Sequence, residues 1–357
     1  MIRTLSPYYV TTSFVSPLTG ETCSKYELDV FIWSGAKTSP PSVATYKFEK
    51  ANFAGSTGND KIDISRLIDD YIDYDFKINN LDTVLLDSDN QVWVKTQVRY
   101  TTADSNDTGI NQVQTTKIAL KGYALGFSGE NQGKPSDEVL MSKSKYKVSR
   151  NSVVSIPFIV EDTAKAVTVV STPLNSINQN FGTVAVSTDS DDIVKVINIR
   201  VGQASTDNLI TVTIGSRVIK LYVVDEYIYT PVDIYFINQF GGQQTLTFFK
   251  ERVEKLSVKK ETYESNTGQA SDGVHQFVDF NVNAKGSFTV ASGFVYENLN
   301  SDFRELLMSS KVYTYSNGVK IPLNVKTSNF TEKTKAKDKL IQYTVEFSYA
   351  YNEINNQ

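Results

Sequence analysis

Apolar residues recur at every second position in many short stretches of this chain, which is the period of β-strands. Residues 91–100 (QVWVKTQVRY) place Val92, Val94 and Val98 on one face. Residues 26–33 (YELDVFIW) alternate at first and are then apolar throughout. Both stretches are predicted to be strands.

One helical period interrupts the strands of the first third. Its apolar residues follow the spacing i, i+3, i+4, i+7 and i+8, at Ile64, Leu67, Ile68, Tyr71 and Ile72. This spacing is typical of one apolar face of a helix. Residues 1–122 are therefore predicted to form a β-sandwich with one short helix.

The next stretch is rich in Gly, Ser, Asn and Pro, so residues 123–137 are predicted to be a linker. Strand-like runs then return at 193–201 (IVKVINIRV), 209–214 (LITVTI) and 218–224. Turn signals recur at a spacing of roughly ten residues, as in immunoglobulin-like domains. Residues 138–228 are predicted to form an immunoglobulin-like β-sandwich.

Residues 229–357 are predicted to form a β-rich domain with one helix at about 301–311. Ser301 is the expected N-cap, and Asp302 suits the positive end of the helix. The expected apolar stripe consists of Phe303, Leu306 and Leu307. The chain as a whole is therefore expected to be mainly β, with two sandwich regions and an α+β C-terminal domain.

A hairpin is expected after this helix. Asn317-Gly318 is the favoured pair for a two-residue type I′ turn, and such a turn would pair Tyr313 with Pro322. Because proline cannot donate to a ladder, Pro322 is expected on an edge strand or at a bulge.

The inventory of reactive side chains is small, with one histidine, His275, and one cysteine, Cys23, among 357 residues. Much chemistry near neutral pH depends on these two residue types. His275 is expected on an exposed strand face, and Cys23 is expected to be a bystander thiol without a disulfide partner. We predict a non-enzymatic protein with no catalytic, cofactor-binding or metal-binding residues.

Three polar segments have a second interpretation. Asp104–Gly109 matches the first half of a calcium loop, but position 12 is Thr115, so a polar hairpin loop is favoured over a cation site. Asp189–Asp192 is a weaker match of the same kind. Lys333–Lys339 is expected to be a solvated hairpin tip, with a basic docking surface as the alternative.

Charge is unevenly distributed. The chain carries a net charge of −4, which gives no indication of a nucleic-acid-binding protein. Residues 60–107 hold eleven acids and five bases, a balance of 5 − 11 = −6. This segment is interpreted as a solvated face or as an acidic docking surface. No apolar run approaches the ~18 residues of a membrane helix, and the N-terminal residues lack a signal-peptide pattern, so synthesis in a cytoplasm is expected.

Several short sequence segments, mainly within residues 229–357, resemble segments of a known group of proteins. They are YTPVDIYFINQFGG and QQTLTFFK (229–250), GFV (293–295), FRELLMSSK (303–311), YTVEFSYAY (343–351) and, near the start, SFVSPLTG (13–20). Their order is similar to tail-associated structural proteins of crAss-like and related phages that infect Bacteroidetes.

The resemblance implies a virion component assembled in the host cytoplasm, such as a ring, hub or connector of a short tail. Its implied partners are copies of itself, in a ring of about six or twelve, and other tail or portal proteins. It brings no active-site residues with it.

Two other functions are considered. A receptor- or glycan-binding fibre or adhesin would need exposed aromatic side chains; Trp93 could face outwards, whereas Trp33 is expected in the core. A glycoside-cleaving enzyme would need two carboxylates ~5–10 Å apart in a cleft.

Overall fold

The structure is a computed structural model, and its mainly β architecture confirms the predicted fold class. Strands from all parts of the chain form several sheets, and helices are short. The description covers residues 1–12, 23–51, 60–79, 81–88, 90–102, 108–124, 133–161, 163–173, 176–186, 193–202, 208–265, 273, 275–316, 318–332 and 341–355.

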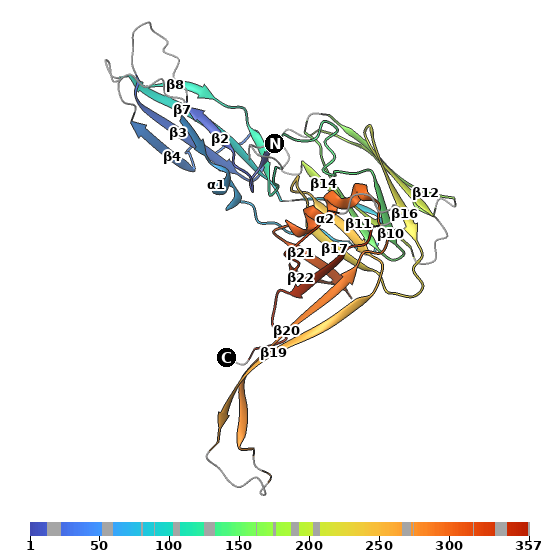
Figure 1. Cartoon of the computed structure of the whole chain (residues 1–357). Helices are drawn as coiled ribbons and strands as arrows, with labels where there is room; N and C mark the ends of the chain where they lie inside the picture. The colour runs from blue at the N-terminus through green and yellow to red at the C-terminus, as the bar shows by residue number, and fades with distance from the viewer. Residues whose placement is uncertain are drawn as a thin grey trace.

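The N-terminal region contains one sheet and a small strand pair (Figure 1). The sheet order is β1 (Ile2–Arg3), β9 (Lys117–Leu120), β7 (Val92–Thr102), β3 (Cys23–Trp33) and β4 (Tyr46–Ala51), with β8 (Thr108–Val113) also paired to β7. The pair is β2 (Tyr9–Thr12) with β5 (Asp60–Asp63), followed by α1 (Ser65–Asp69). Val92, Val94 and Val98 share one core with Ile64 and Ile68, as their spacing predicts.

The middle region is built from two sheets. The first has the order β10 (Lys145–Ser149), β16 (Arg217–Val224), β15 (Leu209–Ile214), β12 (Lys165–Thr172) and β13 (Asn178–Val184). The second has the order β11 (Val153–Ile159), β14 (Val194–Arg200) and β6 (Val84–Asp87). Strand β6 departs from the predicted boundary at residue 122, because it comes from the first third of the chain but pairs with β14.

The C-terminal region is an eight-stranded sheet. Its order is β18 (Gln243–Phe248), β17 (Val232–Ile237), β21 (Val312–Ser316), β22 (Val319–Val325), β23 (Thr344–Tyr349), β20 (Phe277–Ala291) and β19 (Arg252–Glu264), with β24 (Ile354–Asn355) also paired to β20. One face packs apolar side chains such as Phe236, Phe288 and Phe347 into a core that continues into the middle sandwich. We call this the core face and the opposite one the outer face.

The predicted C-terminal helix is present, but its start and end differ from the prediction. It is α2 (Asn300–Leu307), preceded by a 3-10 turn, η2 (Glu297–Leu299). Ser301 is not the N-cap: that position is Leu299, and no side chain caps the helix. Phe303 and Leu306 are buried as expected, and Leu307 is half-buried. The preceding turn replaces the cap, because it leads the chain directly into helical geometry.

The predicted hairpin register is confirmed, since Tyr313 lies opposite Pro322. Gly318 has φ +82°, as a type I′ turn requires, while Asn317 lies outside the described residues. Pro322 is neither on an edge strand nor at a bulge of this pair. It precedes the first β22–β23 pair, Leu323 with Tyr349, so no partner strand requires its missing N–H.

Residues 73–78, which we call the strap, connect the N-terminal region to the outer face of the C-terminal sheet. Tyr74 and Phe76 are buried there, and the Phe76 ring lies 4.7 Å from that of Tyr313. The Lys77 N–H donates to the Gln243 side chain (2.8 Å), whose amide donates back to the Lys77 carbonyl (2.9 Å). The strap therefore joins the two regions through both apolar and backbone contacts.

The acids of the strap pair with lysines of the C-terminal sheet. Asp75 contacts Lys320 at 2.7 Å, and Asp73 lies 3.5 Å from Lys311. Part of the charge of residues 60–107 is therefore matched within the chain itself.

A second junction buries both tryptophans. Trp93 lies on the other face of its strand from Val92 and Val94, as expected. The possibility that it faces outwards is not realised, because it is 1% exposed. Trp33 and Trp93 pack against Leu140 and Ile159 of the middle region. The face of β7 that carries Trp93 is thus covered by the middle region.

Candidate functional site

The most prominent surface feature is a long hairpin formed by β19 and β20, which we call the arm (Figure 1). It projects away from the rest of the molecule, and all thirteen residues of β19 are exposed. Strand β20 pairs with β23 only over residues 287–291 and with β24 only at residues 283–284. Beyond those points the described part of the arm is a two-stranded ribbon, and no third strand pairs with it there.

The register of the arm shifts once, between Lys259 and Glu261. Asn281, on the opposite strand, has φ +48°, a left-handed conformation that asparagine tolerates well. A bulge of this kind bends and twists a hairpin, and so changes the direction of the outer half of the arm.

The outer half of the arm carries exposed aromatic side chains. Tyr263, Phe277 and Phe280 are 50%, 62% and 43% exposed, and we call these three residues the arm tip. The rings of Tyr263 and Phe280 meet edge-to-face at 5.6 Å. A two-stranded hairpin has no core in which to bury such residues, and exposed apolar groups of this kind are typical of interaction sites.

The arm was not predicted from the sequence. His275 is exposed as expected, but it precedes β20 instead of lying within a strand. The available signal was the segment 252–264 (RVEKLSVKKETYE), which has polar residues at both alternating sets of positions. Such a pattern indicates a strand whose two faces are both exposed to solvent.

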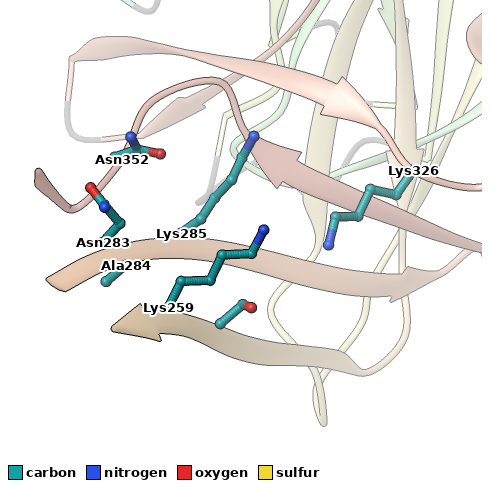
Figure 2. Close-up of a pocket in the computed structure, with 7 residues that line it drawn as sticks. Lys259, Asn283, Ala284, Lys285, Lys326 and Asn352 are labelled. Carbon is teal, nitrogen blue, oxygen red and sulfur yellow. The ribbon is translucent and has the colours of Figure 1, made fainter. Parts of the chain in front are cut away.

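A second surface feature lies at the base of the arm, on the outer face. Figure 2 shows three lysine side chains, Lys259, Lys285 and Lys326, directed toward the same space. They line one hollow together with Ser257, Asn283 and Asn352, and we call this set the lysine cup.

The register explains why these lysines converge. Ser257 pairs with Lys285, and Lys259 pairs with Asn283, so the two lysines lie diagonally on the same face of the hairpin. Lys326 follows β22, and its N–H donates to the Glu346 carbonyl of β23 at 2.8 Å. Strands β19 and β20 and the residue after β22 therefore supply the three ammonium groups.

The lysine cup holds an excess of positive charge. The Lys326 ammonium lies 3.4 Å from the Glu346 carboxylate. Within the described part of the chain, no ion pair is found for Lys259 or Lys285. Like charges held together favour the approach of an anionic group.

The remaining sequence candidates do not join either feature. Cys23 is buried, and its thiol lies 3.3 Å from the Lys25 carbonyl. Asp104 to Asp107, Asp189–Asp192 and Lys333–Lys339 lie outside the described residues. Among the residues that the structure does describe, no three His, Cys, Asp or Glu side chains are placed to hold a metal ion.

Buried carboxylates are a feature that the sequence did not indicate. Asp302 and Glu305 of α2 are 0% and 1% exposed, so these acids do not line an open cleft. Asp302 accepts hydrogen bonds from Gln244 (2.7 Å) and the Tyr146 hydroxyl (3.1 Å). Burial raises the pKa of Asp302 to about 6. Burial, with the neighbouring Asp302 charge, raises the pKa of Glu305 to about 7.

Comparisons with known proteins give little similarity. No family model and no curated protein matches this sequence. One solved structure, of surface layer protein SbsC, domains 4–9, is weakly similar. The alignment covers 84% of this chain and 54% of the SbsC chain, at 11% sequence identity and a TM-score of 0.21. Similarity at this level supports no inference about function. No described helix is both long and apolar enough to span a membrane.

Proposed function

We propose that this protein is a non-enzymatic structural component of a phage virion, part of a symmetric ring or hub in the tail or connector. Its partners are further copies of itself and neighbouring tail or portal proteins. The proposal joins the resemblance of residues 229–357 with one structural observation, the projecting arm with its exposed aromatic tip.

The arm supports an assembly role on energetic grounds. Burying apolar surface contributes about 25 cal/mol per Å² removed from water, and aromatic side chains often dominate interfaces. In the isolated chain, the aromatic rings of the arm tip remain half exposed. Contact with a neighbouring subunit would cover them.

The shape of the arm also suits a ring. Closed rings repeat one interface in which different surfaces of adjacent subunits meet. An element that extends far from its own subunit can reach a surface of the next one. The two-stranded part of the arm also offers unpaired backbone groups at its edges, which can pair with another strand.

Replacing the arm tip should weaken self-association. We expect a triple variant, Tyr263→Ser, Phe277→Ser and Phe280→Ser, to associate at least about tenfold more weakly than the wild type, because the aromatic anchors are lost. Its thermal unfolding should be unchanged, since these side chains lie outside the core. Sedimentation velocity over a concentration series measures the association.

The matched control replaces three exposed apolar residues away from the arm, Val43, Tyr227 and Ile228, with serine. It should associate like the wild type. Equal association of the arm-tip variant and the wild type would contradict the role of the arm. Absence of the protein from purified virions, measured by quantitative mass spectrometry, would contradict the virion assignment.

A further inference from the structure

We propose that the lysine cup binds carboxylate side chains of a second copy of this chain, on a surface formed by Asp70, Asp73 and Asp75. We call these three residues the acidic edge. The inference rests on the proposed self-assembly and adds to it the place where the base of the arm makes contact.

The lysine cup is open and is supported by the sheet. Phe288 and Val290 of β20 lie in the core on the opposite face of the same strand. Because this strand is anchored, Lys285 is attached to a fixed backbone. The amide side chains of Asn283 and Asn352 at the edge of the hollow add groups that can donate hydrogen bonds to a carboxylate.

The other end of the same outer face already contacts an acidic segment. There, Lys320 and Lys311 meet carboxylates of an extended acidic segment, the strap. The residues Tyr313 and Pro322 pair across β21 and β22 on this face, and the strap packs against it through Phe76. This face therefore already binds one acidic segment, while Lys259 and Lys285 have no such partner in the described chain.

The carboxylates of the acidic edge are exposed. Asp70 follows α1, and Asp73 and Asp75 alternate with the buried residues Ile72, Tyr74 and Phe76, so their carboxylates point outwards. The Asp73 side chain is fully exposed despite its contact with Lys311. The edge belongs to the segment 60–107, which carries a net charge of −6. It is thus complementary in sign to the lysine cup.

The arm is less suited to a nucleic acid. Glu254, Glu261 and Glu264 are interspersed among its basic residues, and the chain carries a net charge of −4. A continuous basic surface is typical of binding to a phosphate backbone. A carboxylate-bearing protein surface fits the mixed charges better.

The test is an exchange of charges between two variants of the full-length chain. One variant carries Lys259→Glu and Lys285→Glu, and the other carries Asp70→Lys; Asp73 and Asp75 are kept because they contact Lys311 and Lys320. Each alone should associate at least about tenfold more weakly than the wild type in sedimentation velocity. Mixed in equal amounts, they should associate again, because each supplies a matching surface to the other.

The control reverses two exposed strand lysines elsewhere, Lys47→Glu and Lys145→Glu, and should leave association unchanged. Thermal unfolding of every variant verifies the fold. The wild-type association should also weaken between about 0.05 and about 0.5 M salt, because salt screens exposed charges.

Unchanged association of the Lys259/Lys285 variant, or no recovery in the mixture, would overturn the inference. Tight binding of a single- or double-stranded DNA oligonucleotide by the wild type, lost in the Lys259/Lys285 variant, would also overturn it in favour of a nucleic-acid site. A wild type that stays monomeric at every concentration would instead overturn the proposed assembly itself.

Discussion

We expect the substitution Phe76→Ala to lower the free energy of unfolding by about 3–5 kcal/mol, the range for emptying a buried phenylalanine site. The Phe76 ring is 2% exposed and packs against Tyr74 (5.1 Å) and Tyr313 (4.7 Å). The site lies between regions that are distant in the sequence, so surrounding side chains from two sheets would have to move together to refill it.

The substitution should also separate two unfolding transitions. Both tryptophans, Trp33 and Trp93, lie at the junction of the N-terminal and middle regions, so their fluorescence reports on that junction. Circular dichroism reports on all sheets. In the wild type, we expect urea to produce coincident transitions, whereas in Phe76→Ala the fluorescence transition should come first, because the strap no longer holds the N-terminal region.

Leu81→Ala is a suitable control, because Leu81 lies five residues further along the chain and is 76% exposed. It should change the stability by less than about 0.5 kcal/mol. A loss below about 1 kcal/mol in Phe76→Ala, with coincident transitions, would show that the strap does not hold the regions together.

The second prediction concerns pH. Burial raises the pKa of Asp233 to about 6, from 3.8, and that of Asp302 to about 6 from the same value. The folded state therefore holds protons that the unfolded state has released between about pH 4 and about pH 6. The stabilisation from these bound protons is fully present below the pKa that the two carboxyls have in the unfolded state. It is lost as the pH rises through their pKa in the folded state.

The expected size of this pH effect follows from the shift in pKa. One pKa unit corresponds to about 1.4 kcal/mol, so the two-unit shift of Asp302 makes the protein about 3 kcal/mol less stable above pH 7 than a neutral group would. Asp302→Asn removes this charge and keeps an oxygen that accepts from Gln244 and Tyr146. We expect the variant to be more stable than the wild type at pH 8 and nearly equal to it at pH 4.

Urea unfolding at a series of pH values between 4 and 8, on the order of one unit apart, measures this effect. Asp82→Asn is the control, because Asp82 is exposed, and its profile should follow that of the wild type. Equal slopes for Asp302→Asn and the wild type would contradict a raised pKa at this position.

The sequence predicted the local structure better than the way in which distant parts meet. Alternation identified the shared face of Val92, Val94 and Val98, and turn chemistry identified the Tyr313–Pro322 register. Both depend on neighbouring residues only, because a strand exposes every second side chain to the same face and a two-residue turn sets the pairing.

The burial of Trp93 could not be predicted, for a physical reason. A strand pattern shows which residues share a face, but not whether another region covers that face. The same holds for Asp302: its place at the positive end of the helix was expected, but the pattern did not show that it is buried and accepts hydrogen bonds from Gln244 and Tyr146. Residues 73–78 do alternate polar and apolar side chains, but no strand of the described chain pairs with them, so the pattern did not show what their apolar face packs against.

The candidate site was missed for a related reason. Neither the arm tip nor the lysine cup is a motif, since their members are far apart in the sequence; Lys259 and Lys326, for example, meet only through the sheet order. The mixed polar pattern of residues 252–264 indicates exposure on both faces, but it does not indicate the length or direction of the projection.

The continuity of β20 has a mechanical consequence. This strand runs without interruption from the exposed Phe277 to Val290 in the core, and its last five residues pair with β23. A pulling force along the arm would load the β20–β23 hydrogen bonds in shear, so that they share the tension instead of opening one after another. This arrangement resists extraction of the strand, and we expect stretching of the arm to deform the bulge at Asn281 before the strand leaves the sheet.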